Sequence, residues 1–172
     1  MKELRGELFD QPCELTVITT NGFVKQSGHA VMGRGCAKQA ATKYPLLPRL
    51  LGYAIQEYGN SVHTFDMPDG KTLASFPVKP EKTVCLRDKS NVVGHMKDKF
   101  EEGQEVPGWA SVAVISMIIQ SARELVVIAD KNDWTYIVLP RPGCGAGDLD
   151  WNSTVKPALT GILDNRFSVI TF

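Results

Sequence analysis

The chain has 172 residues, of which 43% are apolar and 22% charged, and its 19 basic and 19 acidic residues cancel to zero net charge. This length suits one domain over residues 1–172, and the neutral balance argues against a general nucleic-acid-binding surface. The four cysteines and three histidines lack metal-ligand spacing and residues 1–10 lack an apolar signal segment, so we expect a cytoplasmic monomer with reduced thiols and no metal.

The first half of the chain is predicted to contain short strands and two helices. Alternating, β-branched segments indicate strands, and apolar residues at helical spacing before glycine or proline indicate helices. In chain order we expect strands at 5–9 and 14–20, helices at 35–43 and 46–60, and strands at 61–66 and 71–78 joined by a turn at 68–70.

The second half begins with a polar, charged segment, 79–108, which we expect to be a long functional loop without regular structure. A helix at 110–130 follows, and its Arg123 and Glu124 argue against a membrane span. The remaining predicted elements are a strand at 134–140, a loop at 141–147, a helix at 149–164 bent near Pro157, and a strand at 167–172. This alternation predicts an α/β fold with a mostly parallel sheet between helices.

Two glycine-rich loops follow predicted strands: the first glycine loop, residues 21–35, ends in MGRG, and the second glycine loop, residues 141–147, contains GCGAG. Ligands of open α/β sheets bind beyond the carboxyl ends of the strands, and glycines let main-chain N–H groups approach them closely. Two such loops facing each other would hold a diphosphate without a cluster of cations. The P-loop motif is absent, and Lys38 occupies the third glycine position of a dinucleotide-binding motif.

Three segments in order, TTNG…AVMGRGCAKQ, SFPVK and VLPRPGCGAGDLDW, resemble the macrodomain, an ADP-ribose-binding module. The similarity runs from Gly6 to the last strand and is greatest to a branch of ADP-ribosyl glycohydrolases that includes the antitoxin that strips ADP-ribose from DNA. It implies a three-layer α/β/α fold with a mixed, largely parallel sheet. It also implies that ADP-ribose is the ligand or substrate, removed from DNA or protein, and that no further cofactor is used.

The resemblance also implies roles for individual residues. Glu7 would accept the adenine amino group, and Leu8 would offer a backbone N–H. Asn21 would lie against the distal ribose and Lys79 matches the lysine that is catalytic in the branch, so these two are the expected catalytic residues. Phe172 would lie near the adenine, although a core position is the simpler interpretation. The other residues expected to bind substrate come from the two loops: Met32, Gly33, Arg34, Gly35, Gly143, Cys144, Gly145, Ala146 and Gly147.

Three features depart from the pattern of the branch. More residues separate Asn21 from Val31 than in the compact form of the first glycine loop. Lys79 is followed by PEKTVCLRDKS and not by His-Trp-Arg. Gly147 stands where some members carry an acid, which removes one general base, and Asp148 is its neighbour.

Each candidate residue also has a plainer interpretation. Lys79 acts as a nucleophile only if burial keeps its amine neutral, and the alternative is a solvated lysine in a charged loop. Asn21 could simply begin an Asn-Gly turn. Cys144 lacks a paired base and is expected to be a small loop residue, and Cys36 is expected to pack in the core.

Three other functions remain possible for such a sequence. The first is a reader that binds ADP-ribose without catalysis, and the second is a phosphatase for ADP-ribose 1″-phosphate. The third, a dehydrogenase that uses a nicotinamide nucleotide, is disfavoured by Lys38.

Overall fold

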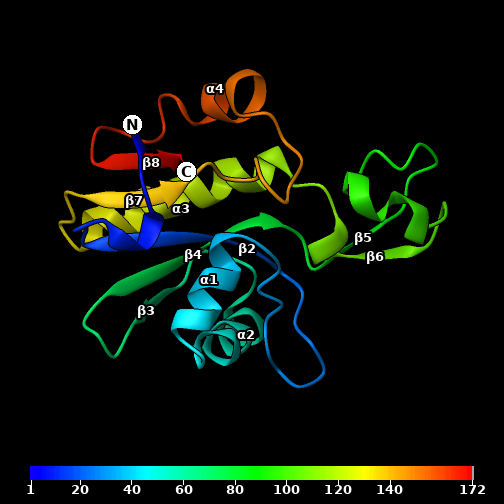
Figure 1. Ribbon diagram of the computed structural model, residues 1–172, viewed down its shortest axis with the longest axis horizontal. Coiled ribbons are helices and arrows are strands. Elements are labelled where there is room, and N and C mark those ends of the chain that lie inside the picture. Colours follow the sequence, from blue (N-terminus) through cyan, green and yellow to red (C-terminus); the bar gives the residue numbers. More distant parts are fainter. Residues whose placement is uncertain (172) are drawn as a thin grey trace.

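The computed structural model describes residues 1–171, and its centre is a six-stranded sheet with the strand order β1-β8-β7-β2-β4-β3 (Figure 1). Five neighbouring strands are parallel, and only β3, at one edge, is antiparallel to its neighbour β4. The strands are β1 (Lys2–Arg5), β2 (Leu15–Asn21), β3 (Thr64–Asp66), β4 (Thr72–Lys79), β7 (Ile137–Pro140) and β8 (Phe167–Thr171). The predicted mixed, largely parallel sheet is therefore confirmed.

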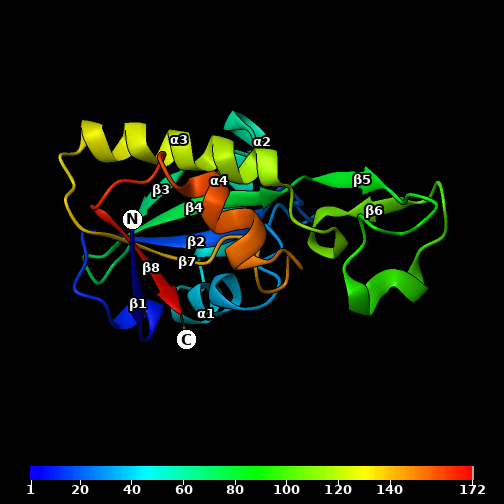
Figure 2. The ribbon, with the colours of Figure 1, turned by 90° about the horizontal axis from the view of Figure 1, so that it is seen from above.

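Helices cover both faces of this sheet. Consecutive strand residues point to opposite faces, so Val17 packs in one core cluster and Ile18 in the other. The cluster around Val17 includes residues of α3 (Ile115–Lys131) and α4 (Lys156–Leu159). The cluster around Ile18 includes residues of α1 (Cys36–Lys43) and α2 (Leu47–Tyr58). The molecule thus has three layers, and Figure 2 shows α3 running alongside the strands.

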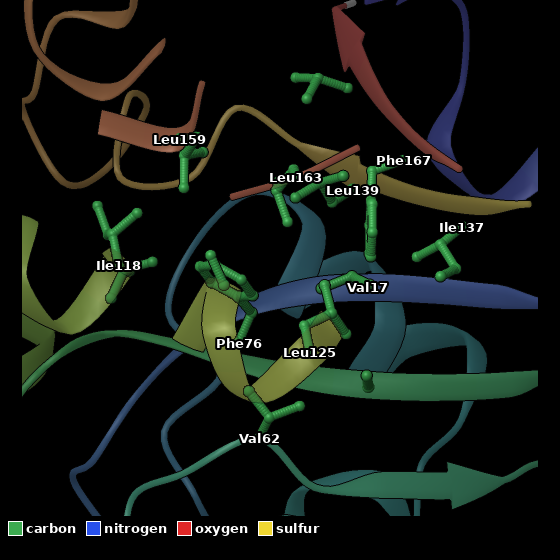
Figure 3. Close-up of a cluster of buried hydrophobic side chains, with 14 of the residues drawn as sticks. Val17, Val62, Phe76, Ile118, Leu125, Ile137, Leu139, Leu159, Leu163 and Phe167 are labelled. Atoms are coloured by element: carbon green, nitrogen blue, oxygen red, sulfur yellow. The ribbon is translucent and has the colours of Figure 1, made fainter. Parts of the chain in front are cut away.

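The core on the α3 face is made of large, fully buried side chains. Figure 3 shows Phe76, Leu125 and Phe167 gathered around Val17 in this cluster. Burying each such side chain contributes about 1.5–3 kcal/mol, so this face fixes α3 firmly against the sheet. Among the helices of residues 1–171, none is long and apolar enough to cross a membrane.

The first predicted strand, 5–9, is wrong. The strand is β1, Lys2–Arg5, and residues Leu8–Asp10 form a 3₁₀ turn. The four side chains of β1 are all exposed because it is an edge strand, so no alternation of burial marks it in the sequence. Leu8 is apolar because it enters the core, where it is fully buried.

Three further elements begin later than predicted: β3 begins at Thr64 and not at 61, and the first predicted residues of α3 and β7 bond elsewhere. α3 begins at Ile115 and not at 110, since the amide of Ala113 bonds to the Gly147 carbonyl and that of Val114 to the Val78 carbonyl. β7 begins at Ile137 and not at 134, since the amides of Thr135 and Tyr136 donate to the Glu14 carboxylate.

The predicted helix 149–164 is also broken up. Asp150 caps a wide π-type turn, Trp151–Val155, and α4 then spans only Lys156–Leu159. Pro157 lies at the start of α4, where its missing N–H is tolerated. Gly161, with φ at 93°, follows the end of the helix. Trp151 is buried.

The segment predicted as a structureless loop, 79–108, has its own small fold. β5 (Lys82–Val84) pairs antiparallel with β6 (Glu105–Pro107), and a 3₁₀ helix spans Gly94–Lys99. We call residues 80–110 the insertion. Its separate core consists of Cys85, Val92, Val106 and Ala110. Figures 1 and 2 show that β5 and β6 stand apart from the main sheet, beyond the carboxyl end of β4.

Candidate functional site

The carboxyl ends of the parallel strands lie along one edge of the sheet, and Asn21 and Lys79 lie side by side at its centre. Asn21 ends β2, Lys79 ends β4, and the two are register partners after a small irregularity at Thr20. The first glycine loop leaves this edge from β2, and the second leaves it from β7, which pairs with β2. Parallel pairing therefore brings together residues that are far apart in the sequence.

Lys79 is buried, with only 6% of its surface exposed, so the interpretation as a solvated loop lysine is wrong. Its ammonium donates to the carbonyl oxygen of Ala146 at 2.6 Å and to that of Trp109 at 3.3 Å. Burial lowers the pKa of Lys79 to about 8, because the charged amine loses hydration, and the negative charge of Asp148 partly opposes this shift. A sizeable fraction of the amine is therefore neutral near pH 8.

A neutral Lys79 suits nucleophilic chemistry at this position. The neutral amine keeps two N–H bonds, which can remain on the Ala146 and Trp109 carbonyls. Its lone pair is then the one direction not occupied by a hydrogen bond. The two carbonyls would hold the side chain in place while the nitrogen stays reactive.

The second glycine loop is closely packed against α3 and the segment before it. Gly143 has φ at 74°, and the amide of Leu149 donates to its carbonyl. A Cβ atom at Gly147 would overlap the Gly143 carbonyl oxygen and approach the Cβ of Ala113 to 2.7 Å. Gly145, in contrast, is exposed and has no atom near the place of a Cβ. The loop is therefore a fixed support with one open glycine.

Cys144 does not carry a reactive thiol in this loop. Its Sγ donates to the carbonyl of Pro142 at 3.4 Å, and burial raises the pKa of the thiol to about 11. Cys36 is buried at the start of α1 beside Thr19, and burial raises its pKa as well. Both thiols stay protonated at neutral pH, which agrees with the packing interpretation.

The extra residues of the first glycine loop fold into a small hairpin. The amide of Lys25 donates to the His29 carbonyl, and Val24 bridges to Ala30. This hairpin returns Val31 to the end of β2, where the side-chain nitrogen of Asn21 donates to its carbonyl at 2.8 Å. The side-chain oxygen of Asn21 accepts from the Phe23 amide at 2.9 Å. Both the nitrogen and the oxygen of the Asn21 amide thus hold the loop closed. Asn21 therefore begins a turn, as the plainer interpretation has it, and also lies beside Lys79.

The last residues of the first glycine loop lead into α1 with open space around them. Met32 packs against the core on the α1 face, and Arg34 is exposed. Gly33 and Gly35 have φ of 57° and 66°, and no atom lies within 4 Å of a Cβ built at either position. Gly35 caps α1, so the unpaired N–H groups of the first helical turn lie directly behind it.

The two glycine loops flank the sheet edge from opposite faces. Met32 packs in the cluster that contains Ile18 and α1, whereas Cys144 packs in the cluster that contains Val17 and α3. The ends of β2 and β7 lie between these faces. This arrangement suits an elongated ligand that lies along the edge.

Glu7 and Leu8 lie at the far end of the same edge. They follow β1, which is separated from β2 by β8 and β7. Glu7 is exposed, and its carbonyl accepts from the side chain of Gln11, while the Leu8 side chain is used in the core. Phe172, considered above as an adenine neighbour, lies outside the described residues.

Two residues near Lys79 were not assigned a role from the sequence. The first is Trp109, which contributes only its carbonyl, and a backbone group leaves no signal in the side-chain pattern. The second is Asp148, whose carboxylate accepts from the Gly94 amide of the insertion. Its place beside the GCGAG motif was visible, but its partner 54 residues away was not.

Comparison with known proteins supports the fold. No family model matches the sequence, and no curated protein matches it. Among solved structures, the macrodomain of Mycobacterium tuberculosis DarG matches 99% of this chain and 97% of its own, with a TM-score of 0.69 and 19% identity. The macrodomain of Thermus aquaticus DarG gives the same TM-score and coverages with 20% identity. Thermosipho africanus DarTG, solved in complex with ADP-ribose, also gives 0.69, with 16% identity, and matches 98% of this chain but only 41% of its own. The chain has the macrodomain fold.

The sequence predicted the macrodomain fold, and two of these structural neighbours are DarG macrodomains. At 16–20% identity these neighbours establish the fold and not the reaction. What this macrodomain does must therefore be argued from its own site.

Proposed function

We propose that this macrodomain binds ADP-ribose along the carboxyl edge of its sheet and removes it from a macromolecular target, DNA or protein, with Lys79 as the catalytic residue. The observation that carries the proposal is the buried amine of Lys79, held by two carbonyls and with a pKa of about 8. A desolvated lysine at a strand end in a ligand-binding fold is expensive to maintain without a function. The ADP-ribose complex of a structural neighbour supports the choice of ligand.

The binding mode follows from the order of groups along the edge. The diphosphate would lie between Gly35 at the start of α1 and Gly145 of the second glycine loop, where backbone N–H groups can approach it. The distal ribose would then reach Lys79 and Asn21 at the centre. The adenine would extend toward Glu7 and the end of β1.

The proposed reaction uses the lone pair of the neutral Lys79 amine. Its nitrogen forms a bond to the anomeric carbon of the distal ribose while the bond from that carbon to the target breaks, and the departing atom takes the proton that the attacking amine loses. Water then adds to the same carbon, the carbon–nitrogen bond breaks, and the amine is restored. Asn21 would position the ribose through the loop that it closes.

The decisive test replaces Lys79 by methionine, which keeps an unbranched side chain one atom shorter and removes the amine. Hydrolysis of ADP-ribosylated DNA or protein should fall at least a thousandfold, while ADP-ribose affinity, measured by calorimetry, should change by less than about tenfold. In the unchanged protein the rate should rise with pH and level off above about 8, because only the neutral amine reacts.

The stability of Lys79→Met provides a second test of the buried amine. The folded-state pKa of Lys79 lies below its ordinary 10.5, so the folded state disfavours the charged amine at pH 7. The shift from 10.5 to about 8 corresponds to about 3 kcal/mol, and the loss of the two Lys79 hydrogen bonds offsets part of it. Lys79→Met should therefore stabilise the fold at pH 7 by about 1 kcal/mol, and the gain should fade as the pH rises from 8 to 10.5. Lys71→Met is the matched control, since Lys71 also donates to a backbone carbonyl but lies near the other end of β4. Equal turnover by Lys79→Met and Lys71→Met would refute the catalytic role.

A non-catalytic reader is the second candidate, because the side chains of Lys79 and Asn21 already have hydrogen-bond partners. The Lys79 amine bonds to two carbonyls, and both ends of the Asn21 amide hold the first glycine loop. A reader would bind ADP-ribose and its conjugates equally well before and after the Lys79→Met substitution, and neither protein would turn a conjugate over. The same calorimetry and hydrolysis measurements therefore separate the two functions.

A further inference from the structure

Asp148 connects the insertion to the proposed active site, and the proposed reaction does not use it. It directly follows the second glycine loop, and its carboxylate oxygen Oδ2 accepts from the Gly94 amide at 2.7 Å. Gly94 begins the 3₁₀ helix Gly94–Lys99 of the insertion. A charged acceptor makes this bond stronger than one between neutral groups.

The backbone of Asp148 is held in an unfavourable conformation. Its φ is 57°, in the left-handed region, where a residue with a Cβ is strained and glycine is not. Such strain persists where surrounding contacts fix it. The hydrogen bond to Gly94 and the bond from the Asp148 amide to the Gly145 carbonyl are contacts of this kind.

Asp148 also acts on Lys79, through its negative charge. It is the charged group that raises the pKa of Lys79 against the effect of burial. Ala146, two residues before it, accepts the shorter of the two Lys79 hydrogen bonds. One short segment, residues 146–148, therefore contacts both the lysine and the insertion.

The insertion borders the place where the bond between the distal ribose and the target would break. It begins directly after Lys79, and Trp109 near its end accepts from the lysine amine. Figure 2 shows β5 and β6 beyond the same end of the sheet. The insertion therefore borders the amine of Lys79, the group that would react with the anomeric carbon.

We propose that Asp148 is a positioning residue: its carboxylate ties the insertion to the second glycine loop and so fixes the surface on which the macromolecular part of the substrate is seated. The inference rests on the proposed function for its last step only. The Asp148–Gly94 hydrogen bond, and the effect of the Asp148 charge on Lys79, do not require a substrate.

Two variants separate the charge of Asp148 from its hydrogen bond. Asp148→Asn removes the charge but keeps a side-chain oxygen for Gly94, whereas Asp148→Ala removes both. Amide hydrogen exchange at residues 92–99 should speed up about tenfold in Asp148→Ala and far less in Asp148→Asn. Both variants should move the Lys79 titration, followed by NMR of its side chain, to lower pH. Asp88→Asn is the control, since Asp88 bonds locally to the Ser90 amide within the insertion.

The substrate measurements test the seating of the target. Asp148→Ala should raise KM for the ADP-ribosylated macromolecule about tenfold, with the affinity for free ADP-ribose within about threefold of the unchanged protein. Unchanged amide exchange at residues 92–99 in Asp148→Ala would show that the Asp148–Gly94 hydrogen bond does not hold the insertion in place. A KM that does not move, or an equal loss of free ADP-ribose affinity, would overturn the seating role. If the protein does not hydrolyse any conjugate, the proposed function has failed. The exchange and titration results still show whether Asp148 holds the insertion and acts on Lys79.

Discussion

Gly33 and Gly35 in the first glycine loop have open space around them, whereas Gly143 and Gly147 in the second glycine loop are packed against Ala113. In the first loop, glycine permits positive φ and leaves the start of α1 accessible. In the second, glycine lets two backbone segments and α3 approach closely. Glycine is therefore used for conformation and access at Gly33 and Gly35, and mainly for close packing at Gly143 and Gly147.

This difference assigns different tasks to the two loops. The second loop holds Lys79 through Ala146 and holds the segment before α3 through Gly147, so it behaves as part of the core. Asn21 holds the first loop at Phe23 and Val31, and Gly33 and Gly35, between Val31 and α1, have open space around them. Substitutions in the second loop should mainly change stability, with Gly145 as the exception, and substitutions near α1 should change both stability and binding.

The largest effect is expected from Gly147→Ala. The new methyl group would overlap the Gly143 carbonyl oxygen and crowd Ala113, and neither backbone nor core can move away easily. We expect a loss of about 3 kcal/mol in the free energy of unfolding, measured by denaturant titration. A loss below about 1 kcal/mol would mean that the loop adapts, and the contrast between the loops would then be false.

A smaller effect, with a different cause, is expected from Gly35→Ala. Its φ of 66° and ψ of −141° suit glycine alone, but a methyl group there meets no neighbouring atom. The cost is therefore backbone strain, about 2 kcal/mol, and ADP-ribose binding should weaken as the start of α1 shifts. Gln39→Ala, on the exposed side of the same helix, is the control and should stay within about 0.5 kcal/mol of the unchanged protein. Full binding by a destabilised Gly35→Ala would show that the helix start does not contact the ligand.

The contrast between the loops could not be read from the sequence, although the loops themselves could. MGRG and GCGAG were visible because glycine clusters after strands have a local signal. What surrounds each glycine depends on residues such as Ala113, more than 30 positions from Gly147, which the topology brings into contact. The buried core strands β2 and β4 were also predictable, since their composition reflects burial.

The errors arise from features that the local sequence does not mark, and several of them from hydrogen bonds to distant partners. The segment 110–114 has the composition of a helix, yet the amides of Ala113 and Val114 bond to Gly147 and Val78. Residues of the insertion look polar and irregular because its core is only four buried residues. The environment of Lys79 likewise depends on two carbonyls from other loops, and the sequence alone does not show that a lysine is desolvated.

The smallest change in stability, and the sharpest test of the comparison, is expected from Gly145→Ala. Gly145 is the open glycine of the packed loop: a methyl group there would meet no protein atom and would need no strained φ. The free energy of unfolding should therefore stay within about 0.5 kcal/mol. ADP-ribose affinity should nevertheless fall about tenfold, because the methyl group would occupy the space that the diphosphate needs for hydrogen bonds to the loop amides. Calorimetry with AMP, which lacks the second phosphate and the distal ribose, should show a change below about twofold. Undiminished ADP-ribose binding would mean that the second loop supports Lys79 without touching the ligand, and only the first loop would then remain as the diphosphate site.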